Sequence, residues 1–451
     1  MKITIAGAGY VGLVTAACLA DKGHDVICVD VNEEKIRRLN EGIVPIYEPG
    51  LEPLIQRNSA RLRFTTDDAE AYRWAEVIMV AVGTPPLPDG SVQLDAVWKA
   101  LGRIAMAVER DCLVAIKSTV PVGTGDEAAR FVAENGRSGV RIDIVSNPEF
   151  LSQGTAVRDT LQAPRIVLGV ESERAERMMK DLYAPFALPY VVTDRRSAEM
   201  IKYAANVFLA LKISYINEIA NVCELVGADI QAVAEGIGMD PRIGRRFLRA
   251  GVGYGGSCLP KDASALYSLA ASHGYSLKTV WAAMDVNEKQ KWKLLDKARL
   301  HIGDFRNRTV AVLGAAFKPG IDDVRESPAL ANIERLIAEG ADVRVWDPAA
   351  LGHVSRRFGD AVVCCQTIEE AIRGADVCFI FTEWPAVLQF DLHRYKTLMK
   401  TPVVVDGRNC YDPKAAEAAG LIYESIGRPV VGGATGVSLY APVATQAEKE
   451  G

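Results

Sequence analysis

A ten-residue stretch in the middle of the chain combines one thiol with residue types that make a thiol reactive. It runs from Gly253 to Asp262 and reads GYGGSCLPKD. The glycines let backbone and substrate approach Cys258 closely, Pro260 fixes the turn that follows, and Lys261 adds a nearby cation. Because the thiolate is the nucleophilic form and a nearby cation favours it, the stretch indicates covalent catalysis by Cys258. A small apolar cysteine in a tight structural loop is the alternative interpretation of the same residues.

The first thirty residues predict a dinucleotide-binding unit. Two strands and the helix between them are expected over residues 2–6, 25–29 and 13–22. Before the helix, Gly7 permits a tight turn, Gly9 permits close approach of a pyrophosphate, and Gly12 permits close packing of the helix on the sheet. Asp30, eighteen residues after Gly12, is placed to bond both ribose hydroxyls. Its charge repels a 2′-phosphate, so the pattern predicts NAD rather than NADP.

The alternation of strands and helices continues through the N-terminal third. Further strands, each ended by polar turn residues, are expected over residues 77–82, 113–117 and 142–146. Apolar strands alternating with helices predict a parallel sheet covered on both faces. Ligands of such sheets bind beyond the carboxyl ends of the strands, where Thr84, Thr119 and Glu149 fall. A role in a turn or a helix cap stays open for all three, since it is common for Thr and Glu after a strand.

A long helix without internal Pro or Gly is predicted over residues 197–226. Lys202 and Asn206 are four residues apart and therefore share one face, for which a solvated surface is the alternative interpretation. The helix has more apolar surface than one neighbour covers, so we expect it to pack against its copy in a homodimer. Another helix, over residues 277–298, is expected to lead into the C-terminal half.

The C-terminal half repeats the strand-led pattern. Its strands are expected over residues 309–313, 342–346, 376–381 and 402–405. The loop after the first strand reads GAAFKPG and lacks a full dinucleotide fingerprint, so this half is expected to bind a different nucleotide. Lys318, Arg325 and Arg408 supply local positive charge for its phosphates.

The predicted fold class is α/β, with two Rossmann-like, doubly wound parallel-sheet domains joined by a long central helix. The expected division is an NAD-binding domain over 1–196, a central helical dimerisation domain with Cys258 over 197–298, a second Rossmann-like domain over 299–430 and a flexible tail over 431–451. A chain of 451 residues exceeds what one hydrophobic core usually serves, which agrees with several domains.

Composition narrows the class of protein. A net charge of −5 predicts no nucleic-acid partner and no anionic membrane surface, and no apolar run is long enough to predict a membrane span. Nine cysteines are scattered without paired C-x-x-C spacing. That distribution predicts a reducing compartment, the cytoplasm, and neither a disulfide framework nor a metal site.

Seven motifs over about residues 1–430 carry a family resemblance. They are GAGYVG at 7–12, STVPVGT at 118–124, NPEFL at 147–151, K-x-x-x-N at 202–206, GGSCLPKD at 255–262, FKPGIDDVRESP at 317–328 and DGRN at 406–409. Together they resemble the UDP-glucose/GDP-mannose dehydrogenase family, which oxidises the C6 alcohol of a nucleotide sugar to a carboxylate. Within the family the resemblance is greatest to enzymes that convert UDP-glucose to UDP-glucuronate for polysaccharide biosynthesis.

The resemblance implies a four-electron oxidation that uses two NAD in succession and one water, with a thiohemiacetal and then a thioester on Cys258. The catalytic residues it implies are Cys258, Lys202, Asn206, Asp262, Thr119 and Glu149. The implied NAD contacts are Gly7, Gly9, Tyr10, Val11, Gly12, Asp30, Lys35, Thr84, Thr119, Lys261 and Arg325. The implied contacts of the UDP-sugar, which C-terminal residues 299–430 would bind, are Glu149, Phe150, Leu151, Gln153, Lys202, Asn206, Phe247, Leu248, Gly251, Gly255, Lys318 and Arg408.

One position departs from the family. Gln153 replaces the second glutamate of NPEFL-x-E-G, the carboxylate usually credited with hydrolysis of the thioester. We expect repeated turnover nevertheless, because Gln153 can orient a water while Glu149, expected on the same helical turn, or the water held by Asp262 takes the proton. Leu259, where UDP-glucose enzymes more often have Phe, leaves GDP-mannose open as substrate. A UDP-N-acetylhexosamine substrate also stays open, as does a nucleotide-sugar-binding protein impaired in hydrolysis.

Overall fold

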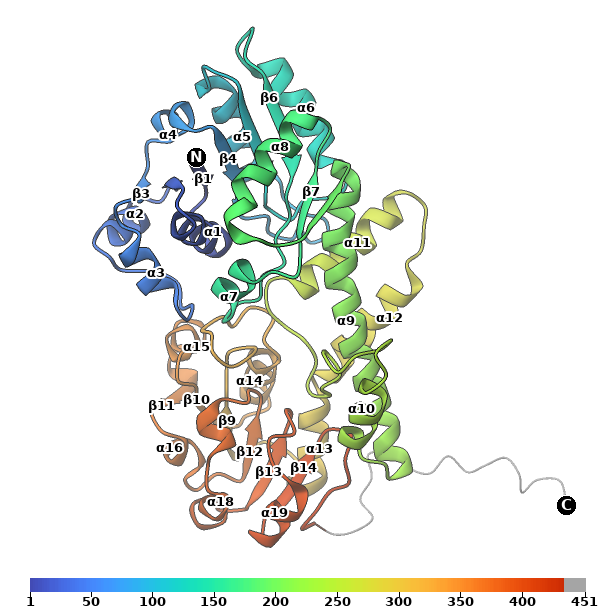
Figure 1. The fold of residues 1–451 in the computed structure, drawn as a ribbon. Coiled ribbons are helices and arrows are strands. Elements are labelled where there is room, and N and C mark those ends of the chain that lie inside the picture. Colours follow the sequence, from blue (N-terminus) through green and yellow to red (C-terminus); the bar gives the residue numbers. More distant parts are fainter. Residues whose placement is uncertain (434–451) are drawn as a thin grey trace, which may run out of the picture. The chain divides into compact units, whose positions relative to one another are not determined.

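The computed structural model describes residues 1–433, so most of the predicted tail, 434–451, lies outside the described residues. The chain forms two compact units, and each is described by itself (Figure 1). The first comprises residues 1–206 and 261–276, and the second comprises 207–260 and the chain from 277 onward. The sequence-based division into four segments remains a prediction. Within residues 1–433, none of the helices has both the length and the apolar character needed to cross a bilayer.

The first unit is built on an eight-stranded sheet in the order β3-β2-β1-β4-β5-β6-β7-β8. The strands are β1 (Lys2–Ala6), β2 (Asp25–Val29), β3 (Leu62–Thr65), β4 (Val77–Val80), β5 (Cys112–Ile116), β6 (Ile142–Ser146), β7 (Ile166–Gly169) and β8 (Tyr190–Thr193). They pair in parallel except at β6 and β7, which meet antiparallel at Ser146 and Gly169. The strand order reverses between β1 and β4, where open sheets of this kind form their ligand crevice.

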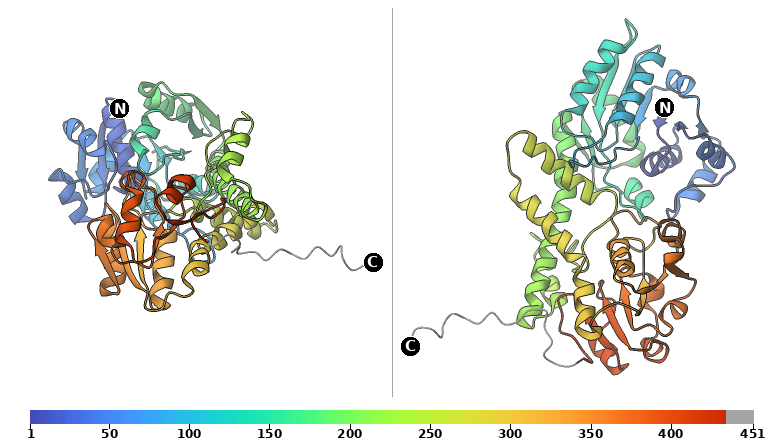
Figure 2. Two further views of the ribbon diagram at one scale, coloured as in Figure 1. Left: turned by 90° about the horizontal axis from the view of Figure 1, so that it is seen from below. Right: turned by 180° about the vertical axis from the view of Figure 1, so that it is seen from behind.

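Helices cover both faces of this sheet (Figure 2). They are α1 (Tyr10–Asp21), α2 (Glu33–Asn40), α3 (Leu51–Arg57), α4 (Asp68–Trp74), α5 (Asp95–Ala107), α6 (Thr124–Asn135), α7 (Ala156–Leu161), α8 (Glu173–Tyr183), the start of α9 (Arg195–Val226) and most of α11 (Leu259–Ser272). Successive strand residues point to opposite faces. Val77 and Met79 accordingly join the core with α1 and α8, while Ile78 and Val80 join the core with α5 and α6.

The second unit has a six-stranded sheet, parallel throughout its described pairs, in the order β11-β10-β9-β12-β13-β14. Its strands are β9 (Thr309–Leu313), β10 (Asp342–Trp346), β11 (Val362–Cys365), β12 (Val377–Ile380), β13 (Val403–Asp406) and β14 (Ile422–Ser425). Its helices are the end of α9, α10 (Ile230–Gly238), α12 (Lys278–Gln290), α13 (Lys293–Ile302), α14 (Pro328–Ala338), α15 (Leu351–Phe358), α16 (Ile368–Ile372), α17 (Pro385–Leu388), α18 (Leu392–Leu398) and α19 (Pro413–Ala418). The predicted class of two Rossmann-like sheets with a long central helix is confirmed.

Two predicted helices differ from the structure. The single helix expected over 277–298 is wrong: it is broken into α12 and α13 at Lys291 and Trp292. The break lets α13 bury Leu294 and Leu295 in the core of the second unit independently of α12. Helix α1 begins at Tyr10, earlier than expected, so Gly12 lies inside its first turn.

The glycines of the first loop serve three different physical needs. Gly7 has φ 107°, a conformation that side chains other than glycine rarely adopt. A Cβ on Gly12 would lie 1.8 Å from the carbonyl oxygen of Gly7, so only glycine lets α1 start this close to β1. A Cβ on Gly9 would meet nothing within 4 Å. The space beside Gly9 is therefore available to a pyrophosphate.

Two alanine substitutions separate these roles. Gly12→Ala is expected to destabilise the protein by about 1–3 kcal/mol, because the methyl group overlaps the Gly7 carbonyl. Gly9→Ala is expected to leave the melting temperature unchanged but to weaken NAD binding at least tenfold, because it fills the phosphate space. Differential scanning calorimetry and NAD titration of both variants test this pair, and equal loss of stability in both would contradict the assignment.

Candidate active site

The carboxylate of Asp30 is held at the end of β2 by three donors. Its Oδ2 accepts from the Ala8 amide at 2.9 Å and from Lys35 Nζ at 2.7 Å, and its Oδ1 accepts from the Asn32 amide at 3.0 Å. Burial opposes the charge, but these bonds outweigh it and hold the pKa of Asp30 below its ordinary value. An ionised carboxylate beside the glycine loop fits a ribose diol.

Four other predicted NAD residues of the first unit follow the carboxyl ends of its strands. Tyr10 and Val11 open α1, Thr84 follows β4, and Thr119 follows β5. Lys261 lies in the first turn of α11. Arg325 belongs to the second unit, where its guanidinium pairs with Asp323 at 2.5 Å. The first-unit residues therefore fit a bound dinucleotide at the strand-order switch point.

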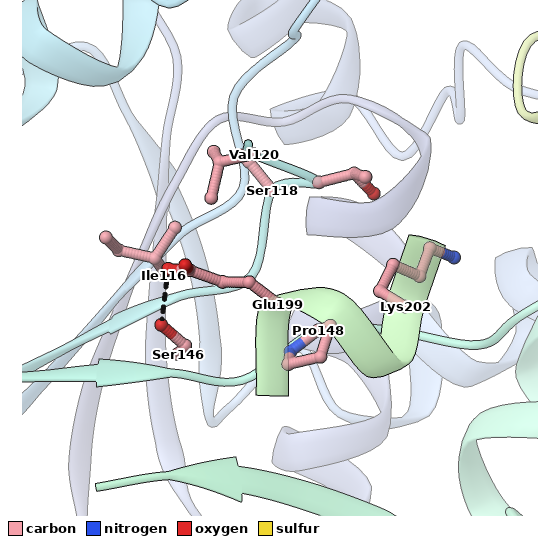
Figure 3. A pocket seen from close by; sticks show the side chains of 8 residues that line it. Ile116, Ser118, Val120, Ser146, Pro148, Glu199 and Lys202 are labelled. Atoms are coloured by element: carbon pink, nitrogen blue, oxygen red, sulfur yellow. Dashed lines mark hydrogen bonds between the residues drawn. The ribbon is translucent and has the colours of Figure 1, made fainter. Parts of the chain in front are cut away.

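A small cavity of about 10 Å³, room for one water, lies beyond the ends of β5 and β6. Its lining is Ile116, Ser118, Thr119, Val120, Ser146, Pro148, Glu199 and Lys202. Glu199 and Lys202 project from one turn of α9 in different directions, Glu199 toward Ser146 (Figure 3). The cavity thus brings Thr119 and Lys202, predicted from distant parts of the chain, to one place.

Lys202 forms a buried ion pair with Glu149. Its Nζ lies 3.0 Å from Glu149 Oε1, and the two side chains are 4% and 8% exposed. The second oxygen of Glu149 accepts from the Leu151 amide at 2.7 Å, and Lys202 also lies over the ring of Phe150. The alternative of a solvated lysine on α9 is therefore wrong. Removing one member of such a pair typically costs about 3–5 kcal/mol.

Asn206, one turn further along α9, contacts α11. Its Nδ2 donates to Asp262 Oδ2 at 2.6 Å, and Lys261 Nζ lies 2.9 Å from Asp262 Oδ1. The Asp262 side chain is only 1% exposed. One face of α9 thus carries two residues, each bonded to a buried carboxylate, which is the arrangement needed to place proton donors and acceptors beside a reacting carbon.

The segment that carries Gln153 is not helical, so the expectation that Glu149 and Gln153 share one helical turn is wrong. Residues 147–155 form a coil and turn, and α7 begins only at Ala156. The Glu149 carboxylate accepts the Leu151 amide, a local bond that competes with helix formation. Gly154, with φ 82°, then reverses the chain.

Two buried groups of the first unit escaped the sequence analysis. Glu199 accepts from the amides of Gly123 and Gly125 at 2.7 and 2.8 Å and so caps α6, while burial raises its pKa. Lys117 donates to Asn147 at 3.4 Å. Burial lowers the pKa of Lys117 to about 8, with Glu149 opposing and Lys202 reinforcing the shift. The position of Lys117 at the end of an apolar strand was the one signal that could have revealed it.

Cys258 lies in the second unit, in an exposed turn directly before α11. The glycines before it are packed tightly: a Cβ on Gly255 would lie 2.2 Å from the Glu326 carbonyl, and one on Gly256 would lie 2.6 Å from the Phe317 ring. The Gly256 amide donates to the Arg325 carbonyl at 2.9 Å. The thiol is therefore exposed on a tightly packed loop, which is compatible with a nucleophile, and its catalytic role stays a prediction.

Asn287 and Asn217, which the sequence analysis missed, also anchor this region. Asn287 exchanges two hydrogen bonds with the backbone of Tyr254, and Asn217 accepts from the Gly251 amide at 2.8 Å. Leu248 packs in the hydrophobic core, whereas Phe247 is 41% exposed in a left-handed conformation with φ 64°. Asn287, Asn217 and Leu248 therefore fix the backbone around residues 248–254, next to the predicted substrate loop.

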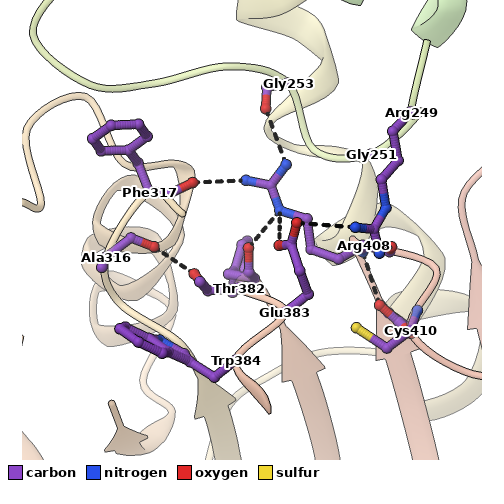
Figure 4. A network of polar contacts seen from close by, with 12 residues as sticks. Arg249, Gly251, Gly253, Ala316, Phe317, Thr382, Glu383, Trp384, Arg408 and Cys410 are labelled. Carbon is purple, nitrogen blue, oxygen red and sulfur yellow. Dashed lines mark hydrogen bonds and ion pairs between the residues drawn. The ribbon is translucent and has the colours of Figure 1, made fainter. Parts of the chain in front are cut away.

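Arg408 is the hub of a polar network in the second unit (Figure 4). Its guanidinium donates to the carbonyls of Phe317 and Phe381 at 3.1 and 2.8 Å and approaches Glu383 at 3.5 Å. Arg249 donates to the Arg408 carbonyl at 3.0 Å. Several Arg408 donors therefore hold loops at the carboxyl ends of the strands, and its predicted phosphate contact stays a prediction, as does that of Lys318.

The second sheet has a carboxylate where the first has Asp30, but its oxygens are saturated. Asp347, after β10, accepts from the amides of residues 315, 316, 349 and 350 at 2.8–3.0 Å and from Trp384 Nε1 at 3.1 Å. No lone pair is left for a ribose diol. This agrees with the expectation that the second unit binds a nucleotide other than NAD.

Comparison with known proteins points to one family. Residues 1–187, 196–289 and 311–413 match the NAD binding domain, the central domain and the UDP binding domain of the UDP-glucose/GDP-mannose dehydrogenase family. The UDP-glucose 6-dehydrogenases YwqF and TuaD of Bacillus subtilis are 47% and 46% identical, over 96% and 98% of this chain and 98% and 96% of theirs. A UDP-glucose dehydrogenase structure from Pyrobaculum islandicum is 39% identical, with a TM-score of 0.89 over 95% of this chain and 98% of that one.

The buried Lys117 predicts a stability change with a defined pH dependence. Its folded-state pKa is below the ordinary lysine value, so folding is penalised below about pH 8, by about 3 kcal/mol, and the penalty fades as the pH rises toward 10.5. Lys117→Met should therefore melt higher than the parent protein at pH 7, with a smaller gap at pH 9.5. The matched control is Lys99→Met, which changes an exposed lysine. A Lys117→Met protein less stable than its parent at pH 7 would contradict the assigned penalty.

Proposed function

The chain belongs to the UDP-glucose/GDP-mannose dehydrogenase family, and from that premise we propose that it oxidises the C6 alcohol of UDP-glucose to the carboxylate of UDP-glucuronate. It is an NAD-dependent oxidoreductase. The observation that carries the proposed reaction is the pair of buried contacts on α9, Lys202 with Glu149 and Asn206 with Asp262. The nucleotide sugar is assigned to the C-terminal domain and NAD to the N-terminal one.

Cys258, Lys202, Asn206 and Asp262 each have a role in the oxidation steps that their chemistry allows, and Thr119 helps to place a water bonded to Asp262. NAD, when bound, would supply the hydride acceptor, once for the alcohol and once, as a second molecule, for the thiohemiacetal, and the hydroxyl proton lost at each step would leave through that water. Cys258 adds its sulfur to the C6 aldehyde, and the resulting thiohemiacetal is oxidised to a thioester. Lys202 and Asn206 donate hydrogen bonds to the C6 oxygen as negative charge develops on it. Asp262 holds Asn206 and Lys261 in register for this task.

Hydrolysis ends the cycle. A water adds to the thioester carbon, the carbon–sulfur bond breaks, and the carboxylate leaves while Cys258 regains its proton. Glu149 takes the proton from the water, since Lys202 and the Leu151 amide hold its carboxylate in one orientation. Gln153 orients the water through its amide oxygen. Because an amide is not a base, we expect hydrolysis to be the slow step.

Leu259, where UDP-glucose enzymes more often have Phe, leaves GDP-mannose open as a second candidate substrate, and a UDP-N-acetylhexosamine is the third. Comparing the rate of NADH formation on the three nucleotide sugars, at equal concentration, decides among them. A protein that binds nucleotide sugars and does not release product is the candidate from another class, motivated by Gln153.

The exposed face of α9 supports a homodimer. Phe208, Tyr215 and Val222 are 62%, 56% and 48% exposed, and their spacing of seven residues places them on one stripe of the helix. A stripe of large apolar side chains in water is typical of a protein–protein interface. We assign this stripe to the contact between two copies of the chain. The cysteines of the described chain form no disulfides with one another, which also supports a cytoplasmic enzyme. A role in polysaccharide biosynthesis rests on the family resemblance alone.

The four-electron reaction predicts a fixed stoichiometry. Two NADH should form for each UDP-glucose consumed, with no aldehyde released and with turnover continuing after the first cycle. Cys258→Ala should abolish formation of the acid and leave NAD binding intact. NADH absorbance and intact-protein mass are the measurements. One NADH per sugar with free aldehyde would exclude the thioester route, and a burst that stops with a lasting uronyl adduct on Cys258 would show that Gln153 has blocked hydrolysis.

The dimer predicts a mass of twice 48.8 kDa in solution. Phe208→Glu combined with Tyr215→Glu should produce monomers at micromolar concentration, because it places charges in an apolar contact. Light scattering measures the mass. The matched control is Met106→Glu, which changes an apolar residue of α5 that is 65% exposed and should leave the dimer intact. A monomeric parent protein would refute the assignment.

A further inference from the structure

Glu48 is a buried carboxylate that the reaction does not use. It lies in the loop between α2 and α3 and is only 7% exposed. A carboxylate taken out of water requires strong hydrogen-bond donors. The identity of its donors therefore shows what the residue holds in place.

The donors come from two functional segments of the first unit. Tyr10, in the glycine loop, donates its hydroxyl to Glu48 Oε2. The Gly154 amide, directly after Gln153, donates to the same oxygen at 2.7 Å and lies 2.9 Å from the Tyr10 hydroxyl. The Val157 amide of α7 completes the set at 3.4 Å from Oε1. One carboxylate thus joins the predicted cofactor loop to the segment that places Gln153.

The other side of Gln153 is also held. Asp159 of α7 accepts from the Ser152 amide at 3.1 Å and from the Thr155 hydroxyl at 2.7 Å. The backbone of Gln153 is therefore bracketed by Asp159 before it and by Glu48 after it. Of these two carboxylates, Glu48 is the one that also accepts a hydrogen bond from Tyr10, a residue of the GAGYVG motif.

We infer that Glu48 is a positioning residue that couples NAD binding to thioester hydrolysis by fixing Tyr10 and the Gln153 segment relative to each other. The charge of Glu48 strengthens the hydrogen bonds that it accepts, and a glutamine would present one acceptor oxygen and one NH2 group in place of two carboxylate oxygens. The Tyr10 hydroxyl and the Gly154 amide donate to the same Glu48 oxygen. A displacement of Tyr10 therefore changes the position of Gly154, and a displacement of Gly154 changes that of Tyr10. The part of this inference that concerns hydrolysis rests on the proposed function.

The test is a double-mutant cycle with two readouts. Glu48→Gln should weaken NAD binding about tenfold, the loss expected for hydrogen bonds to a buried charge, and should raise the steady-state fraction of acylated Cys258. Tyr10→Phe should shift both readouts in the same direction. The double variant should be no worse than Glu48→Gln alone, because the two residues act through one contact. NAD affinity is measured by titration and the acyl enzyme by intact-protein mass.

Two controls separate coupling from general stability. Asp159→Asn loosens the Gln153 segment from its other side, so it should raise the acylated fraction and leave NAD affinity unchanged. Glu52→Gln, at an exposed position of α3, should change neither. If Glu48→Gln does not fold, the Tyr10→Phe variant tests the coupling by itself. This variant is expected to fold, because it removes only the hydroxyl that donates to Glu48. NAD affinity and acylated fraction within twofold of the parent, or additive effects in the double variant, would overturn the inference. A parent protein that is inactive on every nucleotide sugar would refute the proposed function. The NAD affinities of the double-mutant cycle would then still test whether Glu48 and Tyr10 act through one contact.

Discussion

The buried ion pair between Lys202 and Glu149 is the contact on which the arrangement of the first unit's candidate site depends. Moving two charges out of water costs several kcal/mol per ion, and only close geometry with further hydrogen bonds offsets that cost. The Leu151 amide and the 3.0 Å separation supply such geometry. Lys117 places a second buried amine nearby, and burial of its charge lowers the stability of the folded protein. Costly buried charges that cluster in this way are typical of a functional site.

The two sheets show how one topology is used for two purposes. Both carry an Asp after the second strand of the unit, yet their surroundings differ. Asp30 accepts from two amides and Lys35, and the space beside Gly9 is open. Asp347 is saturated by backbone amides and Trp384. The same residue type therefore serves the fold itself in the second unit, whereas in the first unit it keeps acceptor capacity for the predicted ribose contact, and hydrogen-bond satisfaction makes the difference.

The segment around Gln153 shows a limit of local reasoning. The order of apolar and polar residues allowed a helical turn, but a side-chain bond to the backbone and a left-handed glycine prevent it. Glu48 then holds the segment from more than one hundred residues away in the sequence. An interaction of that range leaves no periodic signal near Gln153.

Local sequence patterns were enough to predict the two sheets, most buried strands, the glycine loop with Asp30, and the placement of Lys202 and Asn206 on one helix face. These follow from periodicities and spacings that act within a few residues. Strands β7, β8 and β14 were missed, although they are no shorter than β4, β12 and β13, which were predicted. The folded chain was needed to show that Lys202 is buried against Glu149, that Asn206 contacts Asp262, and that the Asp347 carboxylate is saturated with donors. Burial and partner choice depend on residues brought together from distant parts of the chain, and no local pattern encodes which of them will meet.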